Sequence, residues 1–471
     1  MIFTALFFRH SHFFRGLLFE MVINKPKCHV FVIKVNNFYK KCKINIDTFV
    51  YFCLEFKNTI MLDVGLTTFM ILATSLVMLM TPGLAFFYGG LGCNKNILSI
   101  MMQSFVSMGI GTVLWFAFGY SVCFSGNMHS GTDFFGIIGN FDKAFYHGVT
   151  PSTLYSPDKR FPEYIFIAYQ MMFAIITPAL ITGAFINRVT FKSYVFFLIL
   201  WQIFVYYPFV HMVWGGGLLA EWGVFDFAGG ITVHATAGFA ALASVYFVGR
   251  RQKKHEPNNI PLVAIGTALL WFGWYGFNAG SELAVNSVTI SSFLNTDTAA
   301  SFAAVTWLLI EWNTGKKKPT FIGLMTGAVA GLATITPAAG YVDIYSSAII
   351  GIVAACGCFA AVKYKEKKGW DDALDVWGVH GMGGIIGTIC LGFFANSTIN
   401  AAIPNGLFFG GDGILLFKEC VAIVFAISYA FFFTLFLFKI INKFIPVRVT
   451  DMEQEVGLDL THHGEVARQQ R

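Results

Sequence analysis

Residues 226–242 read DFAGGITVHATAGFAAL and residues 371–381 read DDALDVWGVHG, and the two stretches share one spacing. In each of them a histidine inside a long apolar run follows an aspartate by eight positions. Ionisable side chains are costly in hydrocarbon and usually face a bundle interior or a transport path. The repeated pattern therefore predicts a pore built from two related halves. The four residues are Asp226, His234, Asp372 and His380.

The composition is that of a membrane protein. Hydrophobic residues make up 56% of the chain and charged residues 12%, whereas a soluble domain carries about 25% charged residues. A chain of 471 residues has room for roughly a dozen spans of about 20 residues each. The pattern predicts one all-helical domain with many spans. We expect no nucleic-acid partner, because the excess positive charge is confined to one end of the chain.

That end is the stretch 1–60, which holds nine basic and three acidic side chains, while the rest of the chain balances at 23 of each. It lacks the apolar core and cleavage site of a signal peptide. We therefore expect 1–60 to be an extension of uncertain status, with Met61 as a candidate true start. Residues 61–442 are predicted to form the membrane domain, and 443–471 a cytoplasmic tail.

Eleven apolar segments follow Met61 at intervals that suit transmembrane helices. The predicted segments are 64–88, 97–123, 163–185, 193–213, 226–248, 261–280, 296–313, 320–337, 345–362, 374–395 and 414–441.

The loops between these segments alternate in positive charge. One set is basic, and the other is nearly bare except for the loop 124–161. Cytoplasmic loops carry the excess of lysine and arginine, so the basic set predicts the inner side of a cell inner membrane. The first span then starts outside and the tail lies in the cytoplasm. The basic positions include Lys95, Arg188, Lys192, Arg250, Arg251, Lys316 and Lys363.

Five spans end with the segment that carries His234, and the next five end with the segment that carries His380. An odd number of spans per half turns the two halves in opposite directions across the bilayer. The sequence thus predicts two inverted five-helix repeats plus a final helix, with the two histidines meeting where the halves join. The alternative is that each histidine is a satisfied core residue.

Aromatic residues gather at the predicted outer ends of the third, fifth and sixth segments. Ring faces and one hydroxyl suit a small cation that loses water, because a desolvated cation–π contact contributes up to about 2 kcal/mol. An interfacial aromatic belt is the alternative interpretation. The residues are Tyr169, Phe173, Trp214, Phe277 and Ser281.

Several stretches together resemble one known family. They are DFAGGITVHATAGFAAL, GWYGFNAGS, NRVTFKSYVFF, HMVWGGGLL, DDALDVWGVHG and the tail RVTDMEQEVGLDLTHHGEVA. In order and spacing they resemble the superfamily of ammonium transporters, methylammonium permeases and Rhesus proteins, and within it the bacterial ammonium transporter branch. The resemblance covers the chain from about Leu62 to the tail.

The resemblance implies roles for single positions. Trp214 and Ser281 match an outer site that recruits ammonium, bordered by Tyr169, with Asp226 important for that region. Phe173 and Phe277 match two stacked phenylalanines that gate the pore, and His234 and His380 match its twin histidines. The resemblance also implies a homotrimer, regulation by a PII-type signalling protein at the inner face, and net electrogenic ammonium transport with methylammonium as a second substrate.

Elementary chemistry supports the same substrate. Moving a bare cation into hydrocarbon costs tens of kcal/mol by an idealised estimate, more than a few aromatic contacts return. Ammonium can release a proton and cross an apolar constriction as ammonia, whereas potassium has no such option. Selectivity would then depend on acidity as well as on size.

For the aspartates we expect a supporting role. Asp226, Asp372 and Asp375 each stand near a predicted helix start, where a carboxylate is favoured as a cap. Direct cation binding by Asp226 is the alternative. We expect neither a cofactor nor a metal site, because the two pore histidines have no obvious third intramembrane ligand.

Two further functions are open on the sequence alone. The chain could be an ammonium sensor that signals through its tail, although residues 443–471 are too few for a kinase or cyclase domain. It could also be a membrane enzyme with the histidines as acid and base, but no nucleophile or cofactor motif accompanies them. We therefore expect no enzymatic activity.

Overall fold

The computed structural model describes residues 62–253, 256–315 and 317–467. Within these ranges the chain is helical, with isolated β-bridges in place of strands. The predicted extension 1–60 and the candidate start Met61 lie outside the described residues.

The first half of the membrane domain contains five spans, several of them interrupted by a short π-helical turn. Their elements are α2 (Val64–Leu91), α3 (Ile97–Leu114) continued by η1 (Trp115–Gly119) and α4 (Tyr120–Phe124), α5 (Glu163–Phe185), α6 (Phe191–Trp201) continued by η3 (Gln202–Tyr206) and α7 (Tyr207–Trp214), and η4 (Gly230–Ala235) continued by α9 (Thr236–Val248). The outer loops add η2 (Ala144–Tyr146) and α8 (Leu218–Trp222).

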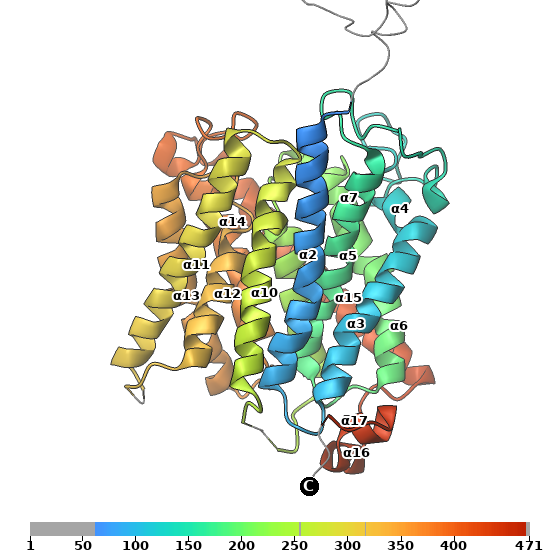
Figure 1. Ribbon diagram of the computed structural model, residues 1–471, viewed down its shortest axis with the longest axis vertical. Helices are drawn as coiled ribbons and strands as arrows, with labels where there is room; N and C mark the ends of the chain where they lie inside the picture. Colours follow the sequence, from blue (N-terminus) through green and yellow to red (C-terminus); the bar gives the residue numbers. More distant parts are fainter. Residues whose placement is uncertain (1–61, 254–255, 316, 468–471) are drawn as a thin grey trace, which may run out of the picture. The chain divides into compact units, whose positions relative to one another are not determined.

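The second half repeats the plan and is followed by a last long helix and a docked tail (Figure 1). Its elements are α10 (Ile260–Ala279) with η5 (Gly280–Glu282), α11 (Ser287–Asn313), α12 (Phe321–Ile335), α13 (Ile344–Lys368), and η6 (Trp377–Gly381) continued by α14 (Met382–Phe394). After η7 (Leu407–Phe409) come α15 (Ile414–Phe444), α16 (Asp451–Val456) and α17 (Leu458–His463).

Ten of the spans described here are long and apolar enough to cross a bilayer, and α12, with 15 residues, is the shorter eleventh. The predicted all-helical architecture of eleven spans is therefore confirmed. The predicted segment 226–248 starts four residues too early, because its helix begins at Gly230 after a turn.

The seventh span also differs from its prediction, because α11 begins at Ser287 and not at residue 296. The stretch SVTISSFLN looks too polar for a membrane helix, but its polar side chains turn inward. The amide nitrogen of Asn295 donates to the carbonyl oxygens of Ala339 and Val342 at 2.9 and 2.8 Å. A polar side chain can be buried in a membrane helix when its polar atoms form hydrogen bonds.

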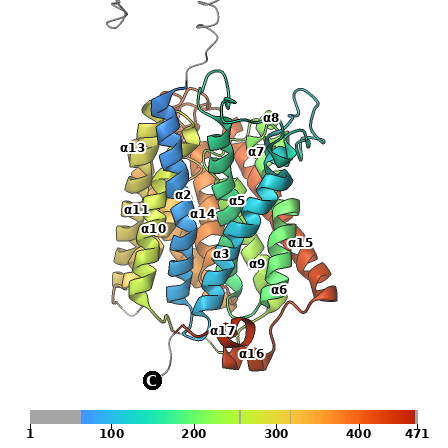
Figure 2. The ribbon, with the colours of Figure 1, turned by 45° about the vertical axis from the view of Figure 1, so that its right-hand side comes forward.

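The two halves run in opposite directions, as the repeat predicts. Helices α2 and α10 begin the halves and pack antiparallel along their length (Figures 1 and 2). Gly83 lies against the backbone of Leu270, and Gly276 lies against that of Ala73. Small residues let membrane helices approach closely, and this replaces the hydrophobic effect as a source of packing.

The strongest sign of the repeat is the crossing of the two histidine-bearing helices. A glycine stands four residues after each histidine, Gly238 after His234 and Gly384 after His380. A Cβ atom on Gly238 would collide with the backbone of Gly381, and one on Gly384 with the backbone of Gly230 and Ala235. Each half therefore leaves room for the other, and this brings the histidines together.

We expect Gly238→Ala to destabilise the purified protein by about 1–3 kcal/mol, because the added methyl group meets backbone that cannot move aside. The measurement is the thermal unfolding midpoint in detergent. Gly109→Ala is the matched control, since Gly109 also lies in a helix but has nothing within 4 Å of its Cβ position. Equal midpoints for the two variants would contradict a close backbone crossing at Gly238.

Candidate functional site

An aromatic cluster lies on the side opposite α16 and α17, where α7 and α10 end and the first half of α5 runs inward (Figure 1). The ring of Phe173 stands edge-on to Trp214 with centroids 5.9 Å apart. Phe173 also meets Phe277 at 4.3 Å with an interplanar angle of 38°. Phe173 and Phe277 are each 1% exposed, so the pair separates the half-buried Trp214 from the interior.

Two hydroxyl groups border this cluster. The Tyr169 hydroxyl lies 3.2 Å from the Ser281 hydroxyl and within reach of the carbonyl oxygens of Gly276 and Phe277, at 2.8 and 2.9 Å. Ser281 donates to the same Phe277 carbonyl at 2.9 Å. Together with the indole of Trp214, these oxygens form a small polar rim above the phenylalanine pair.

Beneath the phenylalanines lie the two predicted histidines. The Nδ1 atoms of His234 and His380 are 3.3 Å apart, so the rings share one hydrogen bond. The His234 ring is nearly parallel to the rings of Phe277 and Trp274, at centroid distances of 6.0 and 5.6 Å. In the described part of the chain, Nε2 of His234 has no hydrogen-bond partner. A buried nitrogen of this kind is free to bind a small polar molecule.

Two cavities meet at His380. The upper one has a volume of about 10 Å³, close to the least that one water needs, on the order of 10–15 Å³. The lower one has a volume of about 280 Å³ and is lined by charged residues. Both are bounded by His380, Tyr88 and Phe87. Both histidines therefore line a constriction for one small molecule, and His380 separates it from a polar inner vestibule.

Asp226 holds the start of the first histidine-bearing helix. Its carboxylate accepts hydrogen bonds from the backbone nitrogens of four successive residues, Gly229 to Thr232, at 2.6 to 3.0 Å, and from the Thr232 hydroxyl at 3.1 Å. Its own carbonyl oxygen accepts from the Trp214 indole at 2.8 Å. The expected capping contact is thus present, and it links the outer rim to the helix of His234.

Asp372 plays the same part in the second half, while Asp375 does not. The Asp372 carboxylate accepts from the backbone nitrogens of Val376 and Trp377 at 3.1 and 2.8 Å. The prediction that Asp375 caps a helix was wrong. Its carboxylate pairs with Lys365, which reaches into the inner vestibule and also donates to the Asp372 carbonyl at 2.6 Å.

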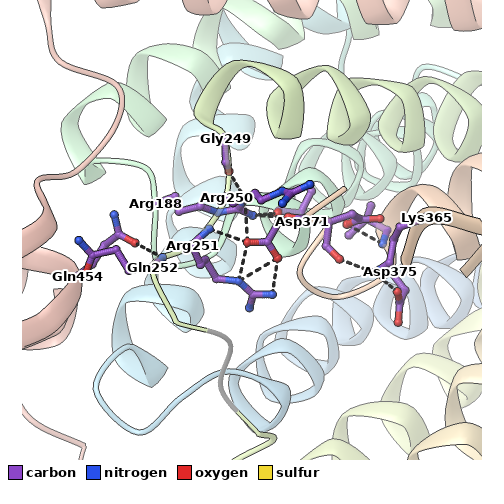
Figure 3. Close-up of polar contacts among 12 residues, drawn as sticks. Arg188, Gly249, Arg250, Arg251, Gln252, Lys365, Asp371, Asp375 and Gln454 are labelled. Carbon is purple, nitrogen blue, oxygen red and sulfur yellow. Dashed lines mark hydrogen bonds and ion pairs between the residues drawn. The ribbon is translucent and has the colours of Figure 1, made fainter. Parts of the chain in front are cut away.

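The neighbouring Asp371 ties the inner loops together (Figure 3). Its carboxylate accepts from the guanidinium of Arg251 at 2.6 and 3.0 Å and lies 3.5 Å from that of Arg188. Burial raises the pKa of Asp371, but the hydrogen bonds from Arg251 and the charge of Arg188 outweigh it and lower that pKa to about 2. Burial lowers the pKa of Arg188 to about 10. Both groups therefore stay charged near neutral pH, which fixes the floor of the vestibule.

Comparison with known proteins shows which family the chain is similar to. The family model described as Ammonium Transporter Family matches residues 68–468. An ammonium transporter of Bacillus subtilis is 43% identical over 414 residues, which cover 87% of this chain and 99% of the relative. The chain belongs to the ammonium transporter family.

Solved structures in this family share the fold. The crystal structure of Candida albicans Mep2 superposes with a TM-score of 0.77 at 33% identity, covering 83% of this chain and 88% of Mep2. A structure titled Sensor Amt Protein gives a TM-score of 0.75 at 28% identity, over 84% of this chain and 98% of that one. Membership of the ammonium transporter family places the chain among transporters and not among enzymes.

The sequence did not single out two residues next to the pore. Trp274 stacks on His234 and donates its indole hydrogen to Thr336 at 2.9 Å. His211 is fully buried three residues before Trp214, and both of its ring nitrogens have partners. An ionisable residue inside an apolar helix is itself a functional signal, and this signal would have found His211.

Proposed function

We propose that this member of the ammonium transporter family takes up ammonium by recruiting the cation and conducting ammonia. Ammonium binds at the outer rim formed by Trp214, Ser281 and Tyr169, in the region held by Asp226. It loses a proton before passing Phe173 and Phe277, and ammonia then crosses beside His234 and His380. The proton also crosses, so that net transport is electrogenic.

One observation carries this proposal. Five rings form a continuous column in which the centroids of neighbouring rings lie no more than 6.0 Å apart. In order, they belong to Trp214, Phe173, Phe277, His234 and His380. It leads from a rim suited to a cation to a constriction suited to one small neutral molecule. The cost of desolvation keeps a bare cation out of the apolar part of that column, whereas neutral ammonia can pass through it.

The test uses the purified protein in proteoliposomes. An ammonium gradient should evoke a transient current, and labelled methylammonium should enter the vesicles at a rate above that of protein-free controls. Vesicles of verified protein content that show neither signal would overturn the proposal.

Trp214→Leu should raise the half-saturating ammonium concentration by about 30-fold, which corresponds to the loss of a desolvated cation–π contact of about 2 kcal/mol. The maximal current should change much less, because the pore below is intact. Trp222→Leu is the matched control, since Trp222 lies in the nearby α8 and is 37% exposed. Equal half-saturation in both variants would remove Trp214 from the recruiting site.

We further propose that the protein is a homotrimer in the cell inner membrane, with one pore per subunit and the tail in the cytoplasm. A PII-type signalling protein would dock at the inner face. The basic loops that follow α2, α5 and α9 lie at the same end of the bundle as the tail, which supports this orientation (Figure 1).

An ammonium sensor is the second candidate because the tail is bonded to α3, a helix of the membrane domain. The Asp459 carboxylate accepts from the backbone nitrogens of Leu98 and Ser99 at 3.1 and 2.7 Å, at the start of α3. A change at the pore could reach the tail by this contact. The current assay separates the two functions, since a sensor without flux gives no current.

A further inference from the structure

A buried histidine and aspartate lie behind the outer rim, outside the ring column. His211 lies on α7, one turn before Trp214, and Asp133 comes from the long outer loop 124–161. Nε2 of His211 is 3.0 Å from an Asp133 carboxylate oxygen, and their side chains are 0% and 3% exposed. This pair joins two segments that are 78 residues apart in the chain.

The partners of His211 determine how many protons the pair holds. Nδ1 lies 2.9 Å from the carbonyl oxygen of Cys123, which can only accept, so this nitrogen must carry a hydrogen. Nε2 faces a carboxylate, which also accepts unless it is protonated. Both ring nitrogens of His211 are therefore hydrogen-bonded only when the His211–Asp133 pair holds one proton more than a neutral imidazole and an ionised carboxylate together. A buried charge-assisted hydrogen bond of this kind is stronger than a neutral one.

The same loop forms backbone hydrogen bonds to the turn that follows Trp214. The backbone nitrogen of Leu218 donates to the Gly136 carbonyl at 2.8 Å, and that of Met128 donates to the Gly216 carbonyl at 3.0 Å. The other Asp133 carboxylate oxygen accepts from the Gly136 backbone nitrogen at 3.2 Å. Asp133 thus bonds both to the helix before Trp214 and to the loop that holds the turn after it.

We propose that His211 and Asp133 are positioning residues for the outer cation site and set its affinity for ammonium through Trp214. This inference rests on the proposed function. The Trp214 indole is fixed at its far end by the Asp226 carbonyl, while its backbone is held by the loop that the pair anchors. Loss of the pair lets that backbone move, and the indole can then no longer meet the cation in one fixed place.

The test measures half-saturation and maximal ammonium current in proteoliposomes for variants at Asp133. Asp133→Ala leaves a buried imidazole nitrogen without a partner and should raise half-saturation about tenfold, with maximal current within about twofold of the parent. Asp133→Asn keeps one hydrogen bond, because its amide can donate to Nε2, so its effect should be smaller. Asp142→Ala, an exposed aspartate in the same loop, should have no effect.

A double-mutant cycle separates positioning from general damage. In the Trp214→Leu background, Asp133→Ala should leave half-saturation unchanged, because the contact it orients is already lost. The proposal is overturned if Asp133→Ala leaves half-saturation unchanged in the parent, if it lowers only the maximal current, or if its effect persists in the Trp214→Leu background. A parent protein without any current would instead refute the proposed function.

Discussion

Replacing His234 with alanine should reduce the ammonium current on the order of a hundredfold, the usual scale for loss of a positioned proton-transfer group. His234 stands between Phe277 and His380, and its Nε2 is the unpartnered nitrogen beside the small cavity. Without this ring, His380 loses its hydrogen-bond partner and the small cavity loses its unpartnered nitrogen. Ammonia and its proton then lose the site through which both pass.

The variants for this experiment separate shape from chemistry. His234→Gln fills much of the same space and can form hydrogen bonds, but it cannot take up a proton near neutral pH. It should therefore remain close to His234→Ala in current. His129→Ala removes an exposed histidine of the outer loop and should behave as the parent does. Full current in His234→Gln would show that only the shape of the ring matters.

Asp226→Ala should both destabilise the protein and abolish ammonium current. Four backbone nitrogens and one hydroxyl lose their acceptor in a buried region, and each buried donor left unsatisfied costs about 1–3 kcal/mol. Some of these donors will find other partners, so we expect a net loss of at least about 3 kcal/mol. The current falls because His234 depends on the start of this helix.

The measurement pairs the thermal unfolding midpoint in detergent with the current in proteoliposomes. Asp343→Ala is the matched control, since Asp343 caps α13 through a single bond to the Ser346 backbone nitrogen at 2.9 Å. Loss of such a cap costs about 0.5–2 kcal/mol and should leave the current intact. A normal midpoint and current in Asp226→Ala would show that the cap does not organise the pore.

The sequence predicted those parts of the fold that depend on local spacing. The eight-residue interval from Asp226 to His234 and from Asp372 to His380 marks a cap followed by a pore residue, and both caps are present. The meeting of the two histidines followed from the odd number of spans per half. These features could be predicted because a repeated pattern leaves few ways to bring its two copies together.

Other parts depend on contacts between distant segments, and the sequence shows no periodicity for those. The polar start of α11 suggested a loop from its local sequence. It is helical because Asn295 finds hydrogen-bond partners in the turn after α12, which is distant in the chain. Asp375 was expected to cap a helix, but its carboxylate forms an ion pair with Lys365 on the preceding helix. The bond from Asp133 to His211 crosses a long irregular loop, whose path no local rule predicts.

The central claim is that the substrate gives up a proton before it enters the apolar column, and the most direct test compares two cations of similar size. Proteoliposomes with the unaltered protein should be given equal inward gradients of ammonium and of potassium at the same ionic strength. We predict that the ammonium current exceeds the potassium current at least about a hundredfold. Potassium cannot release a proton, so it would have to enter the apolar column as a dehydrated cation. Equal currents for both ions through the same protein would contradict the account.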